Sequence, residues 1–162
     1  MREIITIIVA LLWTTWLHAV TIAPGDALSP EEQKKRFTLP KGFIIELVVA
    51  EPDIGQPMNL NFDAQVRLWI SSSVEYPYPA KGDIDEPSGK FNHFSNHPPR
   101  DWLTVVSDLD DSGKAQTVKR FATGLNIPIG TLPLGDGSSI LAYDIPSIRR
   151  HHDHDGDGFA DK

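Results

Sequence analysis

Hydrophobic residues form one long run at the start of the chain and shorter, alternating runs further on. The predominantly apolar run of residues 4–17 follows Arg2, and small residues stand at Ala19 and Ala23. A basic start and an apolar stretch shorter than the roughly 20 residues of a spanning helix are typical of a secretory signal peptide. We therefore predict a signal helix in residues 1–23, with an uncleaved membrane anchor as the alternative. Either alternative places the rest of the chain outside the cytoplasm.

The segment 24–40 is predicted to be a linker with a short helix. Ser29 is followed by a proline at the first helical position and by Glu32 three residues later, a pattern that caps a helix N-terminus. The helix is expected near residues 29–37. Residues 43–50 are then rich in β-branched side chains without a helical polar face, which predicts a buried strand.

Short runs of alternating or β-branched residues continue to the end of the chain. Residues 58–62 and 67–71 predict a hairpin with its turn at 63–66. Further strands are expected at 102–107, 117–121 and 139–143, with a Gly-Asp-Gly turn at 135–137. Residues 41–162 are therefore predicted to be mainly β.

The stretch 76–100 is dense in Pro, Gly, Asn, His and Asp and predicts a long surface loop. Its histidines, His93 and His97, are spaced as two metal ligands on one helix face would be. Adjacent prolines argue against a helix there, which favours solvated loop histidines. Tyr76 and Tyr78, between prolines, are candidates for exposed contact residues.

Composition excludes several classes of function. A net charge of −7 in 162 residues argues against a nucleic-acid partner, because such a surface needs clustered Lys and Arg. The absence of cysteine excludes a disulfide framework, cysteine-ligated zinc and covalent haem attachment. Ser71–Ser73 lack a Gly-x-Ser-x-Gly elbow, and Trp69 and Trp102 at strand positions are expected in the core rather than stacked on sugar.

The sharpest chemical signal is an aspartate loop at the C-terminus. Asp153, Asp155, Asp157, Phe159 and Asp161 occupy the ligand positions of an Asp-x-Asp-x-Asp-Gly calcium loop, where Phe159 offers its backbone carbonyl. Alternate residues of a tight loop bring hard oxygens onto one centre, as Ca²⁺ requires. The glutamate expected at the twelfth position would fall beyond the given sequence. A solvated Asp/Gly turn is the alternative.

An earlier segment repeats this pattern 45 residues upstream. Asp108, Asp110, Ser112, Lys114 and Gln116 stand in the corresponding positions, Lys114 again through its carbonyl. Only the first two are carboxylates, which favours a plain turn over a second metal site. Repeats of about 40 to 50 residues with several short strands are typical of β-propeller blades.

Several strings carry a resemblance together: Leu-Pro-Lys-Gly-Phe (39–43), Glu-Leu-Val-Val-Ala-Glu-Pro (46–52), Gln-Pro-Met (56–58), Arg-Leu-Trp (67–69), Val-Glu-Tyr-Pro-Tyr-Pro-Ala (74–80), Gly-Leu-Asn-Ile-Pro-Ile-Gly (124–130) and the aspartate loop. With them, residues 29–162 resemble the N-terminal propeller of exported bacterial proteins called membrane-bound dehydrogenases. That family is similar to the quinoprotein glucose and sorbosone dehydrogenases and often carries a c-type haem domain downstream.

The resemblance implies a partial propeller of about two blades, cut short before closure. Val66 stands where the family's hairpin turn has glycine, so the turn must differ or carry strain. The blades that would hold a catalytic histidine and the quinone are absent from this sequence. Pyrroloquinoline quinone and haem are therefore expected only in a full-length relative, and no catalytic residue is assigned here.

Two functions follow as expectations. The first is a fragment of an exported, periplasmic or extracellular dehydrogenase-like propeller with a calcium loop, incomplete as an enzyme and partnered by downstream blades and a haem domain. The second is a non-catalytic, calcium-stabilised module that binds carbohydrate or protein. Contact with a membrane is expected only if the signal stays uncleaved. A secreted remnant without activity is a third reading.

Overall fold

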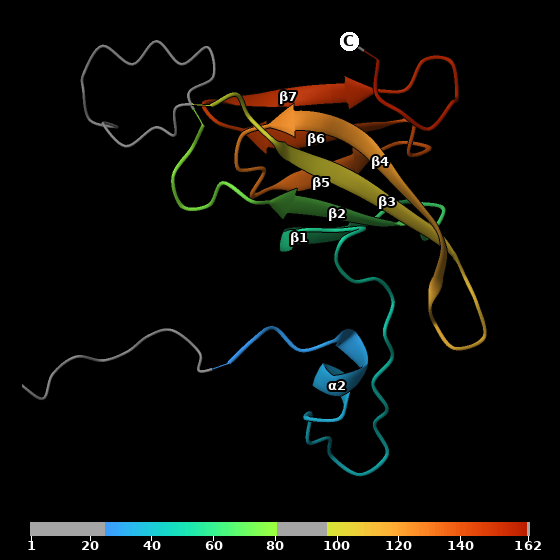
Figure 1. The fold of residues 1–162 in the computed structure, drawn as a ribbon. Coiled ribbons are helices and arrows are strands. Elements are labelled where there is room, and N and C mark those ends of the chain that lie inside the picture. Colours follow the sequence, from blue (N-terminus) through green and yellow to red (C-terminus); the bar gives the residue numbers. More distant parts are fainter. Residues whose placement is uncertain (1–24, 81–96, 162) are drawn as a thin grey trace, which may run out of the picture.

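Two antiparallel sheets face each other in the computed structural model, which describes residues 25–80 and 97–161 (Figure 1). The first sheet has the order β1-β2-β3-β4 and the second the order β5-β6-β7. The strands are β1 (Gln56–Phe62), β2 (Leu68–Ser73), β3 (Asp101–Leu109), β4 (Ala115–Leu125), β5 (Thr131–Leu134), β6 (Ser139–Asp144) and β7 (Ser147–His152), and the helix is α2 (Pro30–Lys34). Within each sheet, consecutive strands are neighbours.

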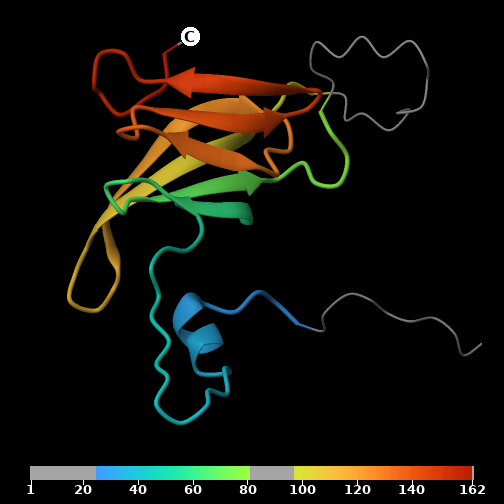
Figure 2. The ribbon, with the colours of Figure 1, turned by 180° about the vertical axis from the view of Figure 1, so that it is seen from behind.

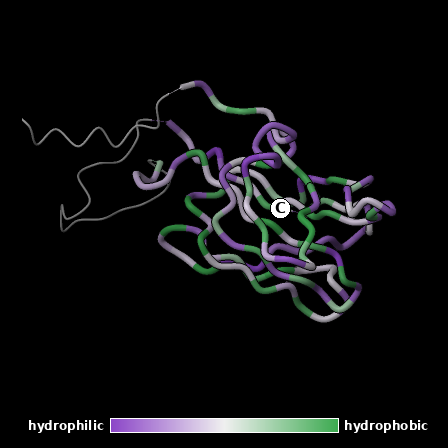
Figure 3. Tube along the Cα trace, turned by 90° about the horizontal axis from the view of Figure 1, so that it is seen from below, coloured by the Kyte–Doolittle hydropathy of each residue, from purple (hydrophilic) through white to green (hydrophobic). Residues whose placement is uncertain are grey.

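A single hydrophobic core joins the sheets. Its members come from β2, β3, β4 and β6: Trp69, Leu103, Val105, Phe121, Ala122, Leu125, Ile140 and Ala142. Trp69, only 1% exposed, meets Phe121 edge to face with ring centroids 4.8 Å apart. Hydrophobic and hydrophilic residues are mixed along the described chain (Figure 3), and β2 and β3 are buried over most of their length. The prediction of a mainly β fold is confirmed.

Most of the predicted elements are present. The hairpin of residues 58–71 is formed by β1 and β2, and the strands expected at 102–107, 117–121 and 139–143 lie within β3, β4 and β6. The predicted helix exists with its capping box, although it ends at Lys34. Within the described residues, no helix is long and apolar enough to cross a bilayer. The signal helix predicted in residues 1–23 lies outside the described part of the chain.

The strand predicted at residues 43–50 is wrong. This segment has no strand, and Phe43 and Ile44 are 69% and 80% exposed. It lies next to α2, below the two sheets, and leads up to β1 (Figures 1 and 2). The segment contacts the sheet through one backbone hydrogen bond, in which Ala115 N donates to Val48 O at 2.9 Å. A β-branched run becomes a strand only where a partner backbone lies alongside it, and here that contact is limited to a single ladder position.

The turn between β1 and β2 has the irregularity expected at Val66. Val66 has a φ of 61°, in the left-handed region that a β-branched residue rarely adopts. Its N–H donates to Asp63 O at 3.0 Å, and Asp63 N donates to Arg67 O at 3.2 Å. The turn is closed by hydrogen bonds, and the strained residue is held in place by them.

Asp63 organises this turn and ties it to the core. Its side chain is inaccessible to solvent and accepts hydrogen bonds from Arg67 Nε at 2.7 Å and Trp69 Nε1 at 2.9 Å. The backbone N–H groups of Gln65 and Arg67 donate to its other oxygen. Burial raises the pKa of Asp63, but these hydrogen bonds outweigh it and hold the pKa below its usual value.

The same turn binds the second sheet. Arg67 Nη2 donates to Gly137 O, and Gln65 Nε2 donates to Asp136 O, both at 2.8 Å. A Cβ on Gly137 would lie 2.6 Å from Asp63 Oδ2, so only glycine permits this approach. The β5–β6 turn therefore packs directly on the Asp63–Arg67 pair.

Asp101 provides a similar connection elsewhere in the sandwich. This fully buried carboxylate accepts from Ser73 Oγ at 2.7 Å and from Ile127 N at 2.9 Å. The adjacent Asn126 N donates to Asp144 Oδ1 at 2.7 Å, at the end of β6. Buried carboxylates that accept hydrogen bonds from backbone and hydroxyl donors therefore help to fix the position of one sheet relative to the other.

Removing the Asp63 carboxylate should destabilise the fold. In Asp63→Ala, the Trp69 indole and the buried Arg67 N–H lose their acceptor, and we expect a loss of about 3 kcal/mol in urea unfolding. Because the folded-state pKa lies below the unfolded value of about 3.9, this stabilisation should be complete above that pH and disappear as the pH falls through the folded pKa. Gln65→Ala, at an exposed position, is the control and should change stability far less.

Relieving Val66 should stabilise the fold. Its side chain is 78% exposed, so Val66→Gly sacrifices little burial while removing the strain of a positive φ. We expect a gain of about 0.5 to 1 kcal/mol in the free energy of unfolding. Val66→Ala, which keeps a Cβ, should gain less than half as much. Equal gains in both variants would show that φ is not the cause.

Candidate metal centre

The aspartate loop of residues 153–161 leaves β7 and returns to the sandwich. Three backbone hydrogen bonds fix its ends: Asp153 N to Ser138 O at 2.9 Å, Ala160 N to Phe121 O at 2.7 Å and Asp161 N to His152 O at 2.8 Å. Ala160 also packs against the hydrophobic core. Both ends of the loop are therefore anchored to the two sheets, which holds Asp153 and Asp161 near each other.

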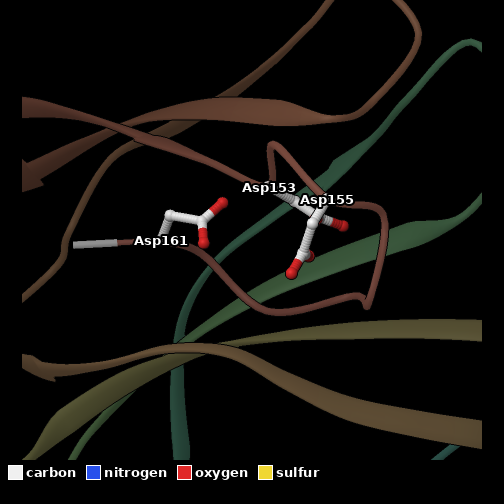
Figure 4. Close-up of side chains that lie close together, drawn as sticks. All are labelled: Asp153, Asp155 and Asp161. Carbon is white, nitrogen blue, oxygen red and sulfur yellow. The ribbon is translucent and has the colours of Figure 1, made fainter.

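Three carboxylates converge in this loop. Asp153, Asp155 and Asp161 each place one oxygen so that these atoms lie within 4.8 Å of one another (Figure 4). Oxygens on opposite sides of Ca²⁺ lie roughly 4.6 to 5.2 Å apart, because each bond is about 2.3 to 2.6 Å long. The spacing therefore fits ligands around one ion of this size. Three nearby negative charges also repel one another unless a cation compensates them.

Backbone N–H groups orient the first aspartate. Asp153 Oδ1 accepts from Gly156 N at 2.7 Å, and Oδ2 accepts from Gly158 N at 2.9 Å. Burial raises the pKa of Asp153, but these bonds outweigh it and lower the pKa, so the carboxylate stays charged. Asp161 Oδ2 similarly accepts from His154 N at 2.6 Å, which closes the loop across its width.

One of the four predicted aspartates lies outside the carboxylate cluster. Asp157 Oδ1 accepts from Phe159 N at 2.8 Å, which turns this carboxylate toward its own backbone. The backbone carbonyl of Asp157 accepts from Lys119 Nζ at 3.2 Å, and a Cβ on Gly158 would lie 2.7 Å from the same nitrogen. The structure thus brings together three of the four predicted aspartates.

Lys119 is the neighbour that sequence reasoning missed. It lies on β4, 38 residues before Asp157, and no local pattern connects it to the loop. Its ammonium lines a pocket of about 310 Å³ together with Asp153 and Asp108. Only the packing of β4 against the loop reveals this contact.

The upstream segment is an internally bonded turn. Asp110 accepts from Ser112 Oγ at 2.7 Å, from Lys114 N at 3.1 Å and from Gln116 Nε2 at 2.8 Å. The Ser112 hydroxyl is the main reason that the pKa of Asp110 lies below its usual value. The Lys114 carbonyl accepts from Asp110 N, and Asp108 bonds to Ser107. These hydrogen bonds close the turn around the Asp110 carboxylate.

The aromatic candidates differ in solvent exposure, and one of the two histidine candidates lies among the described residues. Trp69 and Trp102 are buried, as predicted, whereas Tyr76 and Tyr78 are 54% and 58% exposed. His97 lies 3.4 Å from a carboxylate oxygen of the buried Glu75. The partner suggested for His97 by spacing, His93, lies outside the described residues, so the proposed pair is not tested.

Comparison with known proteins gives one match. A family profile described as "Domain of unknown function (DUF7133)" matches residues 29–162. No curated protein and no solved structure matches the chain. The matched residues begin at the cap of α2 and include both sheets and the aspartate loop. Since the match covers most of the sequence, the chain belongs to the DUF7133 family.

Proposed function

We propose that this chain is a calcium-stabilised β module of an exported protein, in which the loop of residues 153–161 holds the ion. One observation carries the proposal: carboxylate oxygens of Asp153, Asp155 and Asp161 lie within 4.8 Å of one another, a spacing that fits ligands of one calcium ion. Because both ends of the loop bond to the sheets, an ion bound there would fix the C-terminal segment against Phe121 and His152. Its role is structural.

The donor set favours calcium over other common ions. All three side chains offer hard oxygens, and Ca²⁺ accepts six to eight such ligands in flexible geometry. Zinc prefers nitrogen and sulfur in a closed tetrahedron, and the chain has no cysteine. The remaining coordination positions of the ion would be filled by the Asp157 carboxylate, the Phe159 carbonyl and water. Asp157 could bind the ion after its hydrogen bond from Phe159 N is broken.

The wider assignment that we propose is a segment of a dehydrogenase-like propeller. The first sheet is a four-stranded antiparallel meander, the unit of a propeller blade, and the second is a three-stranded meander, one strand short of that unit. The sequence strings that resemble membrane-bound dehydrogenases support the same assignment. Quinone or haem chemistry would then belong to downstream parts of such a protein, and this segment would contribute structure to it.

A non-catalytic binding module is the second candidate. The exposed Tyr76 and Tyr78 follow β2 directly and offer flat aromatic surface to carbohydrate or protein. The coding sequence that follows residue 162 distinguishes the candidates. Further four-stranded repeats and a Cys-x-x-Cys-His motif favour the dehydrogenase-like protein, and a stop codon at that point favours the binding module or an inactive remnant.

Calorimetric titration with Ca²⁺ tests the site. We expect one ion per chain, with a dissociation constant of about 0.1 to 1 mM, the range of extracellular modules. Asp155→Ala should weaken binding by more than about 100-fold, since even residues behind the ligands contribute 10- to 100-fold. Asp155 is exposed, and its carboxylate accepts a hydrogen bond from Asp157 N within the same loop. The fold should therefore survive this change.

Asp110→Ala is the matched control. It removes one carboxylate from the corresponding turn upstream, where Ser112, Lys114 and Gln116 already satisfy it. Calcium binding should be unchanged in this variant. If Asp110→Ala weakens binding as much as Asp155→Ala, the site is misplaced, and if the unaltered chain binds no calcium, the proposal fails.

A further inference from the structure

β7 is the last strand of the smaller sheet and pairs with β6 on one side (Figure 2). A groove of about 580 Å³ lies between β7 and β4, bordered by residues 149–151 and 120–123. The first sheet has four strands and the second has three. The groove therefore occupies the place beside β7 where one more extended segment could lie.

The chain itself shows how an extended segment binds there. Residues 159–161 enter one end of the groove, where Ala160 N donates to Phe121 O of β4 and Asp161 N donates to His152 O of β7. Both sheet edges therefore offer backbone acceptors to a segment between them. Unpaired strand edges of this kind are templates for strand addition.

The opposite side of the sandwich is closed by contrast. Asn61 Nδ2 of β1 donates to Thr131 O of β5, and Thr131 Oγ1 donates to Asn59 Oδ1 at 2.6 Å. These side chains tie the edges of the two sheets together at β1 and β5. The groove between β4 and β7 therefore lies at the edge of the two sheets opposite this connection.

The charge of the groove indicates what it would accept. Arg120, Arg149 and Arg150 line it together with one acidic residue, Asp161, although the whole chain carries −7. Arg149 pairs with the buried Asp144 at 3.2 Å, whereas Arg150 donates to the uncharged Ser139 hydroxyl, so Arg120 and Arg150 supply the positive charge of the groove. Nε2 of His151, which also lines the groove, is buried and has no hydrogen-bond partner among the described residues.

We propose that the groove between β4 and β7 binds an extended, acidic peptide segment of a partner protein, which adds to the edge of β7 as a fourth strand. Backbone hydrogen bonds along β7 would supply affinity, and the arginines would select acidic side chains. A nucleic acid is a poorer match, because the acidic remainder of the chain repels a phosphate backbone. The proposal does not rest on calcium binding, although Asp161 belongs both to the groove and to the carboxylate cluster.

A tethered strand tests the proposal. The sequence Glu-Val-Glu-Val-Glu-Val would be joined to the C-terminus of the full chain through a flexible Gly/Ser linker, which gives a millimolar effective concentration. Hydrogen exchange of residues 147–152 and 121–123 should slow by at least about tenfold relative to the chain with the linker alone. Exchange in β1 and β2 should stay the same.

Two matched controls examine charge. A Lys-Val-Lys-Val-Lys-Val tether should give little protection, and the double variant Arg120→Gln/Arg150→Gln should lose most of the protection given by the acidic tether. Unchanged exchange with the acidic tether, equal protection by the lysine tether, or protection of β1 and β5 instead of β7 would each overturn the proposal. Protection of β7 by dimerisation of the untethered chain, measured by light scattering, would identify a second copy as the occupant and also overturn it.

Discussion

The buried carboxylate of Asp63 is the interaction on which the arrangement of the two sheets depends. It binds the indole of Trp69, which lies in the core, and the guanidinium of Arg67, which reaches the β5–β6 turn at Gly137. One side chain thus links a hairpin turn, the core and the second sheet. A buried charge is tolerated there because backbone and side-chain donors surround it.

The aspartate loop uses the same chemistry at the surface with a different result. Backbone donors also hold Asp153, Asp155 and Asp161, but these three carboxylates place oxygens within 4.8 Å of one another, whereas the donors to Asp63 include a guanidinium and an indole. The loop does not stand alone, because its ends bond to Phe121 and His152. The proposed ion would therefore act on both sheets, close to the groove that separates β4 from β7.

Sequence reasoning succeeded where the information is local. Alternation predicted the hairpin of residues 58–71. Aspartate spacing predicted four converging carboxylates, of which Asp153, Asp155 and Asp161 come together and Asp157 does not. It missed β5, which has only four residues and contains Pro133, and β7, whose sequence Ser-Ile-Arg-Arg-His-His lacks the apolar alternation of a half-buried strand.

The remaining misses concern contacts between distant segments. The apolar run at residues 43–50 was assigned to a strand, but no partner backbone extends along it, and its first residues lie in solvent. Lys119 beside the loop was missed because its position depends on how β4 packs. The orientation of Asp157 was missed because it depends on a hydrogen bond from Phe159. These features follow from tertiary structure, which local sequence patterns do not encode.

The most direct test of the account is the free energy of unfolding in urea as a function of free Ca²⁺ at constant ionic strength. If the ion binds the folded loop, stability should rise with the logarithm of calcium concentration, by about 2.7 kcal/mol at 100 times the dissociation constant. Asp155→Ala should remove this dependence. Identical unfolding curves in excess calcium and in chelator would contradict the claim that the loop is a calcium site that stabilises the two sheets.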